Sequence, residues 1–172
     1  MTLVVYLLIK IKIVMKEMIL LFISCLMSIS VTAQDECSVY IDDCWLEHNV
    51  YVNNTKGMKI HSRLEIENMR GKTLCVIAFF AYDYNEDERI PIKSRTGNNR
   101  YRNGNNELCT GDYAYAKYDE TIWDDFVLFI PYNEFGAAVS ESSSLCCVVS
   151  VQSKSGVPYA VSEVMTFDYY KD

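Results

Sequence analysis

The sequence predicts an all-β fold, a single antiparallel β-sandwich, on three observations. Between 57 and 67 the side chains alternate, with apolar or small residues from Met58 to Ile66 at even positions and mostly charged residues at odd positions. This period of two indicates a strand with one face in a core and the other in water. The stretch from Thr73 to Tyr82 is apolar, aromatic and β-branched, which suits a central strand. No stretch shows a helical periodicity of useful length.

The segment from Asn68 to Lys72 joins these two strands and has the residue types of a turn. We therefore expect the strands at 57–67 and 73–82 to pair with each other as a hairpin. A hairpin alone is only marginally stable in water, so the rest of the chain must supply the strands of a second sheet.

Six further strands follow from alternation, β-branched content and flanking turn residues. They are expected at 45–52, 89–92, 112–117, 126–131, 145–152 and 160–167. The strand at 89–92 should lie at a sheet edge, because Pro91 cannot donate a hydrogen bond to a ladder. The last two strands should form a hairpin through a turn at 153–156. About seven to eight strands at this short spacing are typical of an immunoglobulin-like sandwich.

Three further segments between these strands carry signals of their own. The stretch 94–111 is rich in Gly and Asn and predicts a long loop, and loops of that length are often functional. Residues 118–125 are expected to turn the chain, and Tyr132 to Phe135 to form one helical turn.

The N-terminus has the features of a secretory signal peptide. Lys10, Lys12 and Lys16 precede an apolar run, and a small-residue cleavage pattern ends at Ala33. We therefore expect export to remove residues 1–33. Met15, followed by a lysine, has the form of a natural start, so that residues 2–14 would lie upstream of it.

Two alternatives for the N-terminus stay open. A membrane anchor beginning at Leu3 would be interrupted by charged residues, and neither apolar half reaches the roughly 20 residues that span a bilayer. A lipoprotein would use Cys25, but Phe22 stands where such signals usually carry Leu. We rank cleavage after Ala33 first.

The mature chain, residues 34–172, is long enough for one domain with its own core. It carries 13 basic and 22 acidic residues, a formal net charge of −9. This acidity argues against nucleic acid and against anionic lipid as partners. We expect an exported protein that is periplasmic, outer-surface or extracellular, without a stable membrane span after signal cleavage.

Six cysteines remain after signal cleavage, an even number that permits a disulfide framework in an exported chain. Sequence alone cannot choose among the 15 possible pairings. We expect at least one bond, with Cys37–Cys44 the most economical local pair. Cys146 and Cys147 must point to opposite faces of one strand, so one should face inward, toward Cys75, and the other outward. Cys75 could also be a small buried hydrophobe, and the spacing supplies no CxxC-type zinc knuckle.

Four motifs together resemble a known family. They are Trp45-x-x-His48-Asn49-Val50-Tyr51, Gly57-Met58-x-Ile60-His61, Ala78-x-Phe80 and Asp125-Phe126-x-x-Phe129-Ile130-Pro131-Tyr132. The chain thereby resembles an uncharacterised secreted β-sandwich domain of Gram-negative gut bacteria, which occurs alone or attached to caspase-like or trypsin-like peptidase domains. The resemblance runs from Trp45 to Phe167 and implies the fold, but no activity. The many cysteines and the Asn/Gly-rich loop depart from the family pattern.

The candidate ligand-binding site lies in the long loop, at Arg95, Arg100, Tyr101 and Arg102. Arg and Tyr on a loop are the residue types that binding surfaces favour, and rigid sandwiches commonly carry function on loops. The alternative is a basic strip that the acidic stretch 107–125 neutralises. A second candidate is an aromatic platform for a sugar ring, made by Tyr113, Tyr115, Tyr118 and Trp123, although such residues also serve as ordinary packing.

No other motif predicts a site. Asp83-x-Asn85-x-Asp87 opens like a calcium loop but lacks the glycine and the closing glutamate, so an acidic, solvated tip is the better interpretation. His61 alternates with Lys59 and Arg63 and should be a surface residue, and His48 should be half-buried and hydrogen-bonded. Neither histidine has a recognisable nucleophile signature.

The sequence therefore favours an exported, non-catalytic β-sandwich module without metal or cofactor, which binds an unknown protein or polysaccharide. Two alternatives stay open. One is a secreted hydrolase that uses acidic residues of the 107–125 stretch, which would require paired carboxylates in a cleft. The other is a purely structural envelope protein.

Overall fold

The computed structural model describes residues 37–84, 89–135 and 142–170. Within them the chain forms nine strands and two short 3₁₀ helices. These are β1 (Ser38–Val52), β2 (Thr55–Glu67), β3 (Thr73–Tyr84), β4 (Arg89–Pro91), η1 (Asn99–Tyr101), β5 (Cys109–Tyr115), β6 (Glu120–Pro131), η2 (Tyr132–Glu134), β7 (Ser142–Gln152), β8 (Pro158–Val161) and β9 (Met165–Tyr170). No helix in these ranges is long and apolar enough to cross a membrane.

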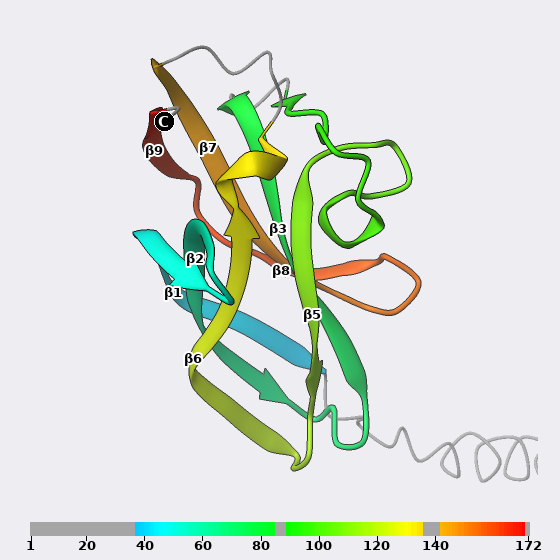
Figure 1. Ribbon diagram of the computed structural model, residues 1–172. Helices are drawn as coiled ribbons and strands as arrows, with labels where there is room; N and C mark the ends of the chain where they lie inside the picture. Colours follow the sequence, from blue (N-terminus) through cyan, green and yellow to red (C-terminus); the bar gives the residue numbers. More distant parts are fainter. Residues whose placement is uncertain (1–36, 85–88, 136–141, 171–172) are drawn as a thin grey trace, which may run out of the picture. The chain divides into compact units, whose positions relative to one another are not determined.

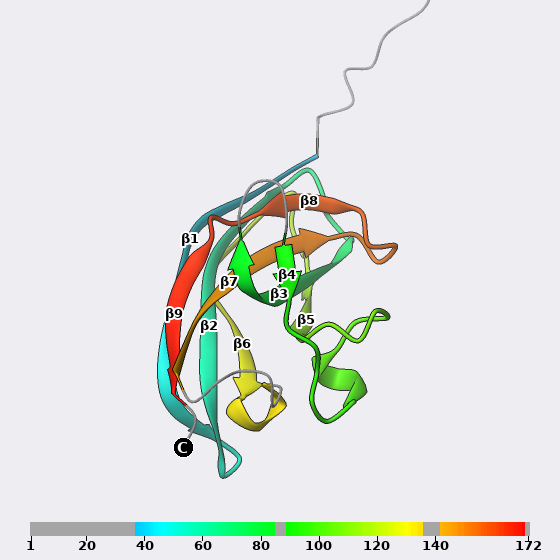
Figure 2. The ribbon, with the colours of Figure 1, turned by 90° about the horizontal axis from the view of Figure 1, so that it is seen from above.

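The strands form two antiparallel sheets, as the sequence predicts (Figure 1). The first has the order β1-β2-β6. In the second, β3 and β7 pair along their length, β5 and β4 extend the free side of β3, and β8 and β9 extend the free side of β7. The view from above shows β1, β2 and β9 along one side and β5 with the long loop along the other (Figure 2). Thus β5 and β6 are edge strands of different sheets.

The predicted hairpin between 57–67 and 73–82 is wrong. β2 pairs with β1 and β6, whereas β3 pairs with β4, β5 and β7, so the segment from Asn68 to Lys72 crosses from one sheet to the other. The crossing is held by the segment between β5 and β6, which also passes between the sheets. Asn68 N donates to Asp119 O at 2.7 Å, and Gly71 N donates to Ala116 O at 2.7 Å.

The true hairpin joins β1 to β2. Its turn residues Asn53 and Asn54 have φ of 50° and 61°, and two consecutive positive φ values match the right-handed twist of the paired strands. The pairing runs from Val52 opposite Thr55 to Ser38 opposite Glu67. The predicted first strand therefore begins earlier in the chain, at Ser38.

Other boundaries differ from the prediction as well: β5 begins at Cys109, inside the expected loop 94–111. Most of the expected turn at 118–125 is strand, because β6 begins at Glu120. The expected strand at 160–167 is divided into β8 and β9, which pair with successive parts of β7. The edge strand with Pro91, the helical turn at Tyr132 and the pairing of the last strands with β7 are confirmed.

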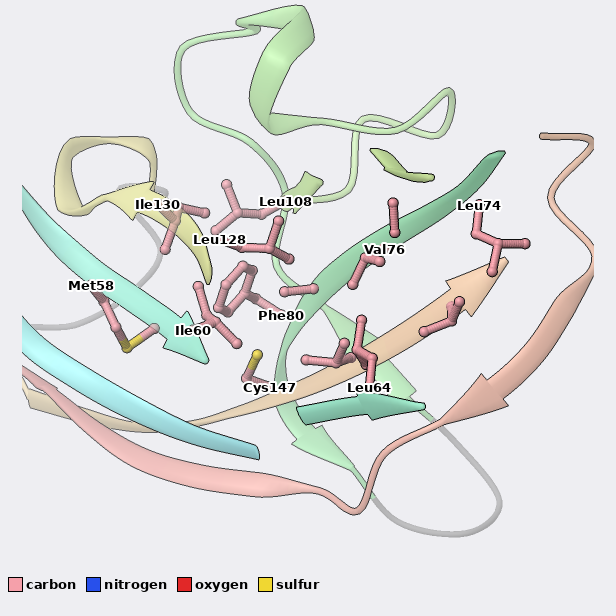
Figure 3. Close-up of a cluster of buried hydrophobic side chains, with 14 of the residues drawn as sticks. Met58, Ile60, Leu64, Leu74, Val76, Phe80, Leu108, Leu128, Ile130 and Cys147 are labelled. Atoms are coloured by element: carbon pink, nitrogen blue, oxygen red, sulfur yellow. The ribbon is translucent and has the colours of Figure 1, made fainter. Parts of the chain in front are cut away.

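One apolar core lies between the sheets and confirms the alternation predicted for 57–67. The even-numbered side chains of β2 from Met58 to Ile66 are buried. They meet Leu74, Val76 and Phe80 of β3, and Figure 3 shows these side chains pointing toward one another. The ring of Phe80 packs edge-on against Phe135, with centroids 5.4 Å apart.

The predicted cysteine pairs are corrected by the strand geometry. Cys37 immediately precedes β1 and Cys44 lies within it, so the extended backbone holds their Cα atoms roughly 20 Å apart, whereas a disulfide needs about 4.4–6.8 Å. Cys147 faces inward as one of the two adjacent cysteines should, but Cys75 faces outward on the same sheet, so these two cannot pair. No disulfide joins the cysteines of the described ranges.

Candidate functional site

A cleft of about 250 Å³ opens where the edge strands β5 and β6 approach each other. The residues that bring polar groups or rings to it are Asn53, Thr55, Arg100, Tyr101, Thr110, Asp112 and Phe129. The Thr110 hydroxyl donates to the Phe129 carbonyl oxygen at 2.8 Å and ties the two edges together. The cleft therefore combines both sheets, the β1–β2 hairpin and the long loop.

Two glycines let backbone and ring approach closely beside the cleft. A Cβ on Gly57 would lie 2.3 Å from the Ile130 carbonyl oxygen and 2.6 Å from Cζ of Phe129, so the Phe129 ring can pack over β2 only because this position has no side chain. A Cβ on Gly111 would lie 3.0 Å from the Val76 carbonyl oxygen. The shape of the cleft wall thus depends on both positions.

The long loop, residues 93–108, is anchored to the domain through a buried carboxylate. The Thr96 hydroxyl donates to the side chain of Glu134, which is 4% exposed and lies in η2. Arg95 N donates to the Glu134 carbonyl oxygen at 3.3 Å. At the end of the loop, Leu108 N donates to Ile92 O at 2.7 Å. These contacts fix both ends of the loop against the second sheet and η2.

Asparagine side chains shape the interior of the loop. Asn98 caps η1, because its Oδ1 accepts from Arg100 N at 3.1 Å. Asn103 Oδ1 accepts from the backbone N–H groups of Asn105 and Glu107 at 3.0 and 2.9 Å. The amide of Asn103 also donates to the Glu107 carboxylate at 2.8 Å. The Asn-rich composition therefore supplies turn hydrogen bonds.

The four predicted ligand-binding residues separate into different roles. Arg100 and Tyr101 line the cleft. The guanidinium carbon of Arg100 lies 6.0 Å from the Tyr101 ring centroid, and Arg100 makes no ion pair with the described residues. Arg102 instead donates to Asn99 Oδ1 at 3.0 and 2.7 Å and to Asn106 Oδ1 at 3.2 Å, which makes it a staple within the loop. The side chain of Arg95 is exposed and does not line the cleft.

Thr110 was missed by sequence reasoning, and Asp112 was indicated only as one of the acids of the 107–125 stretch. Both lie on β5, and both bring oxygen atoms to the same cleft as Arg100. Asp112 Oδ1 accepts from Tyr113 N at 2.8 Å. No sequence signal connects them with the loop, because their proximity arises from the docking of the loop onto β5 and β6.

A second polar cluster lies on the outer face of the first sheet. His61 is on the predicted face but is 8% exposed rather than at the surface, because the Trp45 ring stacks on it with centroids 4.9 Å apart. Its Nδ1 lies 2.7 Å from Asp125 Oδ1, and its Nε2 lies 3.4 Å from Glu47 Oε2. The ring thus joins β1 and β6 across β2 and presents neither nitrogen to a nucleophile.

His48 is hydrogen-bonded, as predicted, but its side chain is exposed rather than half-buried. Its Nδ1 lies 3.1 Å from the Tyr132 hydroxyl, and its ring lies 5.6 Å from that of Phe167. Partial burial lowers the pKa of His48. The contacts link β1 to η2 and β9, which is a packing role.

The acids of the 107–125 stretch are dispersed. Glu107 bonds within the loop, Asp119 pairs with Arg70 at 3.8 Å, Asp124 with Arg63 at 3.8 Å and Asp125 with His61. Among the acids of this stretch, only Asp112 lines the cleft.

The aromatic platform is divided in the same way. Tyr113, Tyr115 and Tyr118 are exposed, whereas Trp123 packs against the core and against Phe126 with centroids 6.3 Å apart. Trp123 is therefore framework. Residues 85–88 of the calcium-like motif lie outside the described residues, and in the described ranges no three metal-ligating side chains converge.

Comparison of the chain with models of protein families, with characterised proteins and with solved structures gives no match. The function of the cleft is therefore inferred from its own geometry.

Proposed function

We propose that the protein is an exported, non-catalytic binding module whose cleft receives one negatively charged unit of a polysaccharide. The observation that carries this proposal is the Arg100 guanidinium, which stands in the cleft beside the Tyr101 ring and forms no ion pair with the described residues. A guanidinium without a carboxylate partner is available to bind one from a ligand.

The size of the cleft favours one unit of a polymer. Its volume of about 250 Å³ is below the roughly 300–1,000 Å³ of sites that enclose a whole small molecule. A single sugar ring would fill the cleft. The rest of the polysaccharide would continue along the open edges of β5 and β6. A larger ligand of this kind gains affinity from several weak contacts.

The chemistry of the lining suits a uronic acid. Arg100 can donate two hydrogen bonds to the sugar carboxylate in a bidentate arrangement, and the Tyr101 ring offers an apolar face with a hydroxyl at its end. Asp112 lies on β5 in the same cleft, as an acceptor for a sugar hydroxyl. Because the domain is acidic overall, the local positive charge of Arg100 should make binding sensitive to salt.

The finer assignments belong to the same proposal. The immunoglobulin-like arrangement is supported by two packed antiparallel sheets, and export by the signal-like features that end at Ala33. The resemblance to secreted sandwich domains of gut bacteria supports a role beside other exported proteins. In this view the domain recruits a polysaccharide for a neighbouring partner.

The test is a glycan array with the purified exported protein, followed by titration of oligogalacturonate and its methyl-esterified form. We expect binding of the acidic form only, and at least a tenfold loss for Arg100→Ala. Arg95→Ala is the matched control, because this arginine is exposed in the same loop but lies outside the cleft. Equal loss in both variants, or no acidic glycan bound, would contradict the proposal.

The alternatives give different results in the same experiment. The secreted hydrolase predicts shortening of the bound oligosaccharide, and the structural envelope protein predicts no binding to any glycan. If the domain pulls down a partner protein and the Arg100→Ala variant still binds it, the partner surface lies elsewhere. Tyr113 and Tyr115 are then the next residues to replace.

A further inference from the structure

Two cysteines of different sheets face the same interior. Cys147 of β7 is fully buried in the core cluster, and Figure 3 shows its sulfur beside Ile60 and Phe80. Cys44 of β1 packs against this cluster from the other sheet. The remaining cysteines of the described ranges lie elsewhere. Cys37 is exposed before β1, and the alternation of β3, β5 and β7 turns Cys75, Cys109 and Cys146 to the outer face of the second sheet.

The segment between β8 and β9 brings Cys44 next to the part of β7 that carries Cys147. Cys44 lies close to Ser162 of this segment, since both line one cavity. Ser162 Oγ accepts from Val149 N at 2.9 Å, and Ser162 N donates to Val149 O at 2.8 Å. Val149 and Cys147 are two residues apart on β7, so their side chains share the inward face.

A second set of contacts leads to the same place. Met165 lies opposite Cys147 in the pairing of β7 with β9, and it lines a cavity of about 210 Å³ together with Cys44 and Ser162. The register of β1 shifts between Ile41 and Asp43, and such a bulge beside Cys44 is a point where the strand can adjust.

We propose that Cys44 and Cys147 form a disulfide that joins the two sheets through the core when the protein meets a disulfide oxidant. This bond replaces the Cys37–Cys44 and Cys75–Cys147 pairs expected from the sequence. It is independent of the ligand of the cleft, because the cavity beside Cys44 is lined by different residues.

The chemistry is thiol–disulfide exchange. The Cys44 thiolate attacks one sulfur of the oxidant, an oxidoreductase disulfide or a small-molecule disulfide, and releases the other sulfur as a thiolate. The Cys147 thiolate then attacks Cys44 Sγ and releases the second thiolate. Two protons leave the protein thiols, and two electrons reduce the oxidant to a dithiol. Cys44 reacts first, because it lines the cavity whereas Cys147 is fully buried.

The protonation of both thiols agrees with their proximity. Burial, opposed by the hydrogen bond to Ser162 and assisted by the charge of Asp43, raises the pKa of Cys44 to about 11. Burial also raises the pKa of Cys147, and the neighbouring thiols of Cys44 and Cys146 raise it further. Because exchange needs the thiolate, the folded dithiol should react slowly near neutral pH, and the bond should form mainly while the chain folds.

Peptide mapping tests the pair directly. The protein is refolded with a mixture of reduced and oxidised glutathione, alkylated and digested without reduction. We expect one cross-linked peptide that contains Cys44 and Cys147, and two fewer alkylated thiols than in the reduced protein. Alkylation of both residues, or a cross-link of either one to another cysteine, would overturn the proposal.

Matched variants make the test independent of the digest. We expect the wild-type midpoint of thermal unfolding to fall by more than about 5 °C on reduction. Cys44→Ser, at a partly exposed position, should abolish this difference, and the control Cys37→Ser, at an exposed one, should retain it. A redox-dependent difference that survives in Cys44→Ser would contradict the proposed bond, even where a Cys147 variant fails to fold.

Discussion

The two-sheet core and the long loop, residues 93–108, are stabilised by different interactions. In the core, buried apolar side chains such as Met58, Leu64 and Phe80 pack between the sheets. The loop contributes no residue between Lys93 and Glu107 to that core except Tyr101, which packs against it. It is shaped by hydrogen bonds from Asn98, Asn103 and Arg102.

This difference predicts which part of the domain a substitution should destabilise. Apolar packing is shared by the whole domain, so its loss lowers global stability. Side-chain hydrogen bonds in a loop act on one segment, so their loss should open that segment while the sheets stay folded. The cleft belongs to both regions, since β5 and β6 form its wall and the loop supplies Arg100 and Tyr101.

The largest expected effect comes from the core. Phe80→Ala should lower the free energy of unfolding by about 3–5 kcal/mol, because it removes a fully buried ring that packs against Phe135 and Phe167. Urea unfolding followed by fluorescence measures it. Tyr113→Ala, at a side chain that is 66% exposed, is the control and should change the value by less than about 0.5 kcal/mol. Similar losses of unfolding free energy in both variants would contradict the burial of Phe80 in the core.

A smaller and local effect is expected in the loop. Asn103→Ala removes the acceptor of two backbone N–H groups and should weaken the loop by about 1–2 kcal/mol. Amide hydrogen exchange should become roughly tenfold faster at Asn105 and Glu107 and stay unchanged in β3 and β7, since 1.4 kcal/mol corresponds to a factor of ten. Asn105→Ala, whose exposed side chain makes no contact of this kind among the described residues, should leave both rates as they are. If hydrogen exchange accelerates throughout the sheets as well, the loop does not open separately from the core.

The smallest effect concerns pH. Cys44 has a folded-state pKa of about 11, raised from an ordinary value of 9.0, and the pKa of Cys147 is raised in the same direction. The folded state therefore holds its thiol protons more tightly than the unfolded state, so this contribution to stability is complete below pH 9 and is lost as pH rises toward 11. The midpoint of the reduced protein should fall by about 2–4 °C over this window. Cys44→Ser should show a smaller fall, and an equal fall would assign the loss to other groups.

The strand content could be predicted because its signals are local. The alternation from Met58 to Ile66 fixes which face of β2 is buried, whatever strands lie beside it. The start of β6 was missed because Glu120 and Asp124, charged and exposed on the outer face, resemble a turn, while Thr121 and Trp123 are the inward residues opposite Ile66 and Leu64.

Which strands pair could not be predicted from the sequence, because strand pairing depends on residues far apart in the chain. Asn68 and Gly71 adopt positive φ values of 56° and 78°, a conformation that serves a tight hairpin and a crossing between sheets equally well. The choice is made by the segment at 116–119, which holds the crossing through its backbone.

The site shows the same limit. Loop composition indicated Arg100 and Tyr101, and the structure places both in the cleft. The same composition indicated Arg102, which differs only in having Asn99 and Asn106 within reach of its guanidinium. Asp112 was indicated only as one of the acids of the 107–125 stretch, because its relation to Arg100 exists only after the loop has docked.

The crossing from β2 to β3 also governs when the domain can fold. β2 needs β6, as Gly57 lies opposite Pro131, and β3 needs β7, as Ala81 lies opposite Cys146. Of the pairs among the described strands, only β1–β2 and β3–β4 join immediate neighbours in the first part of the chain. A chain emerging from a ribosome or a translocation channel therefore leaves the second side of β2 unpaired until β6 ends at Pro131, and the β7 side of β3 unpaired until β7 has appeared. Such non-local pairing is characteristic of folding in milliseconds to seconds, and the exposed edges during that delay give chaperones a reason to hold the chain.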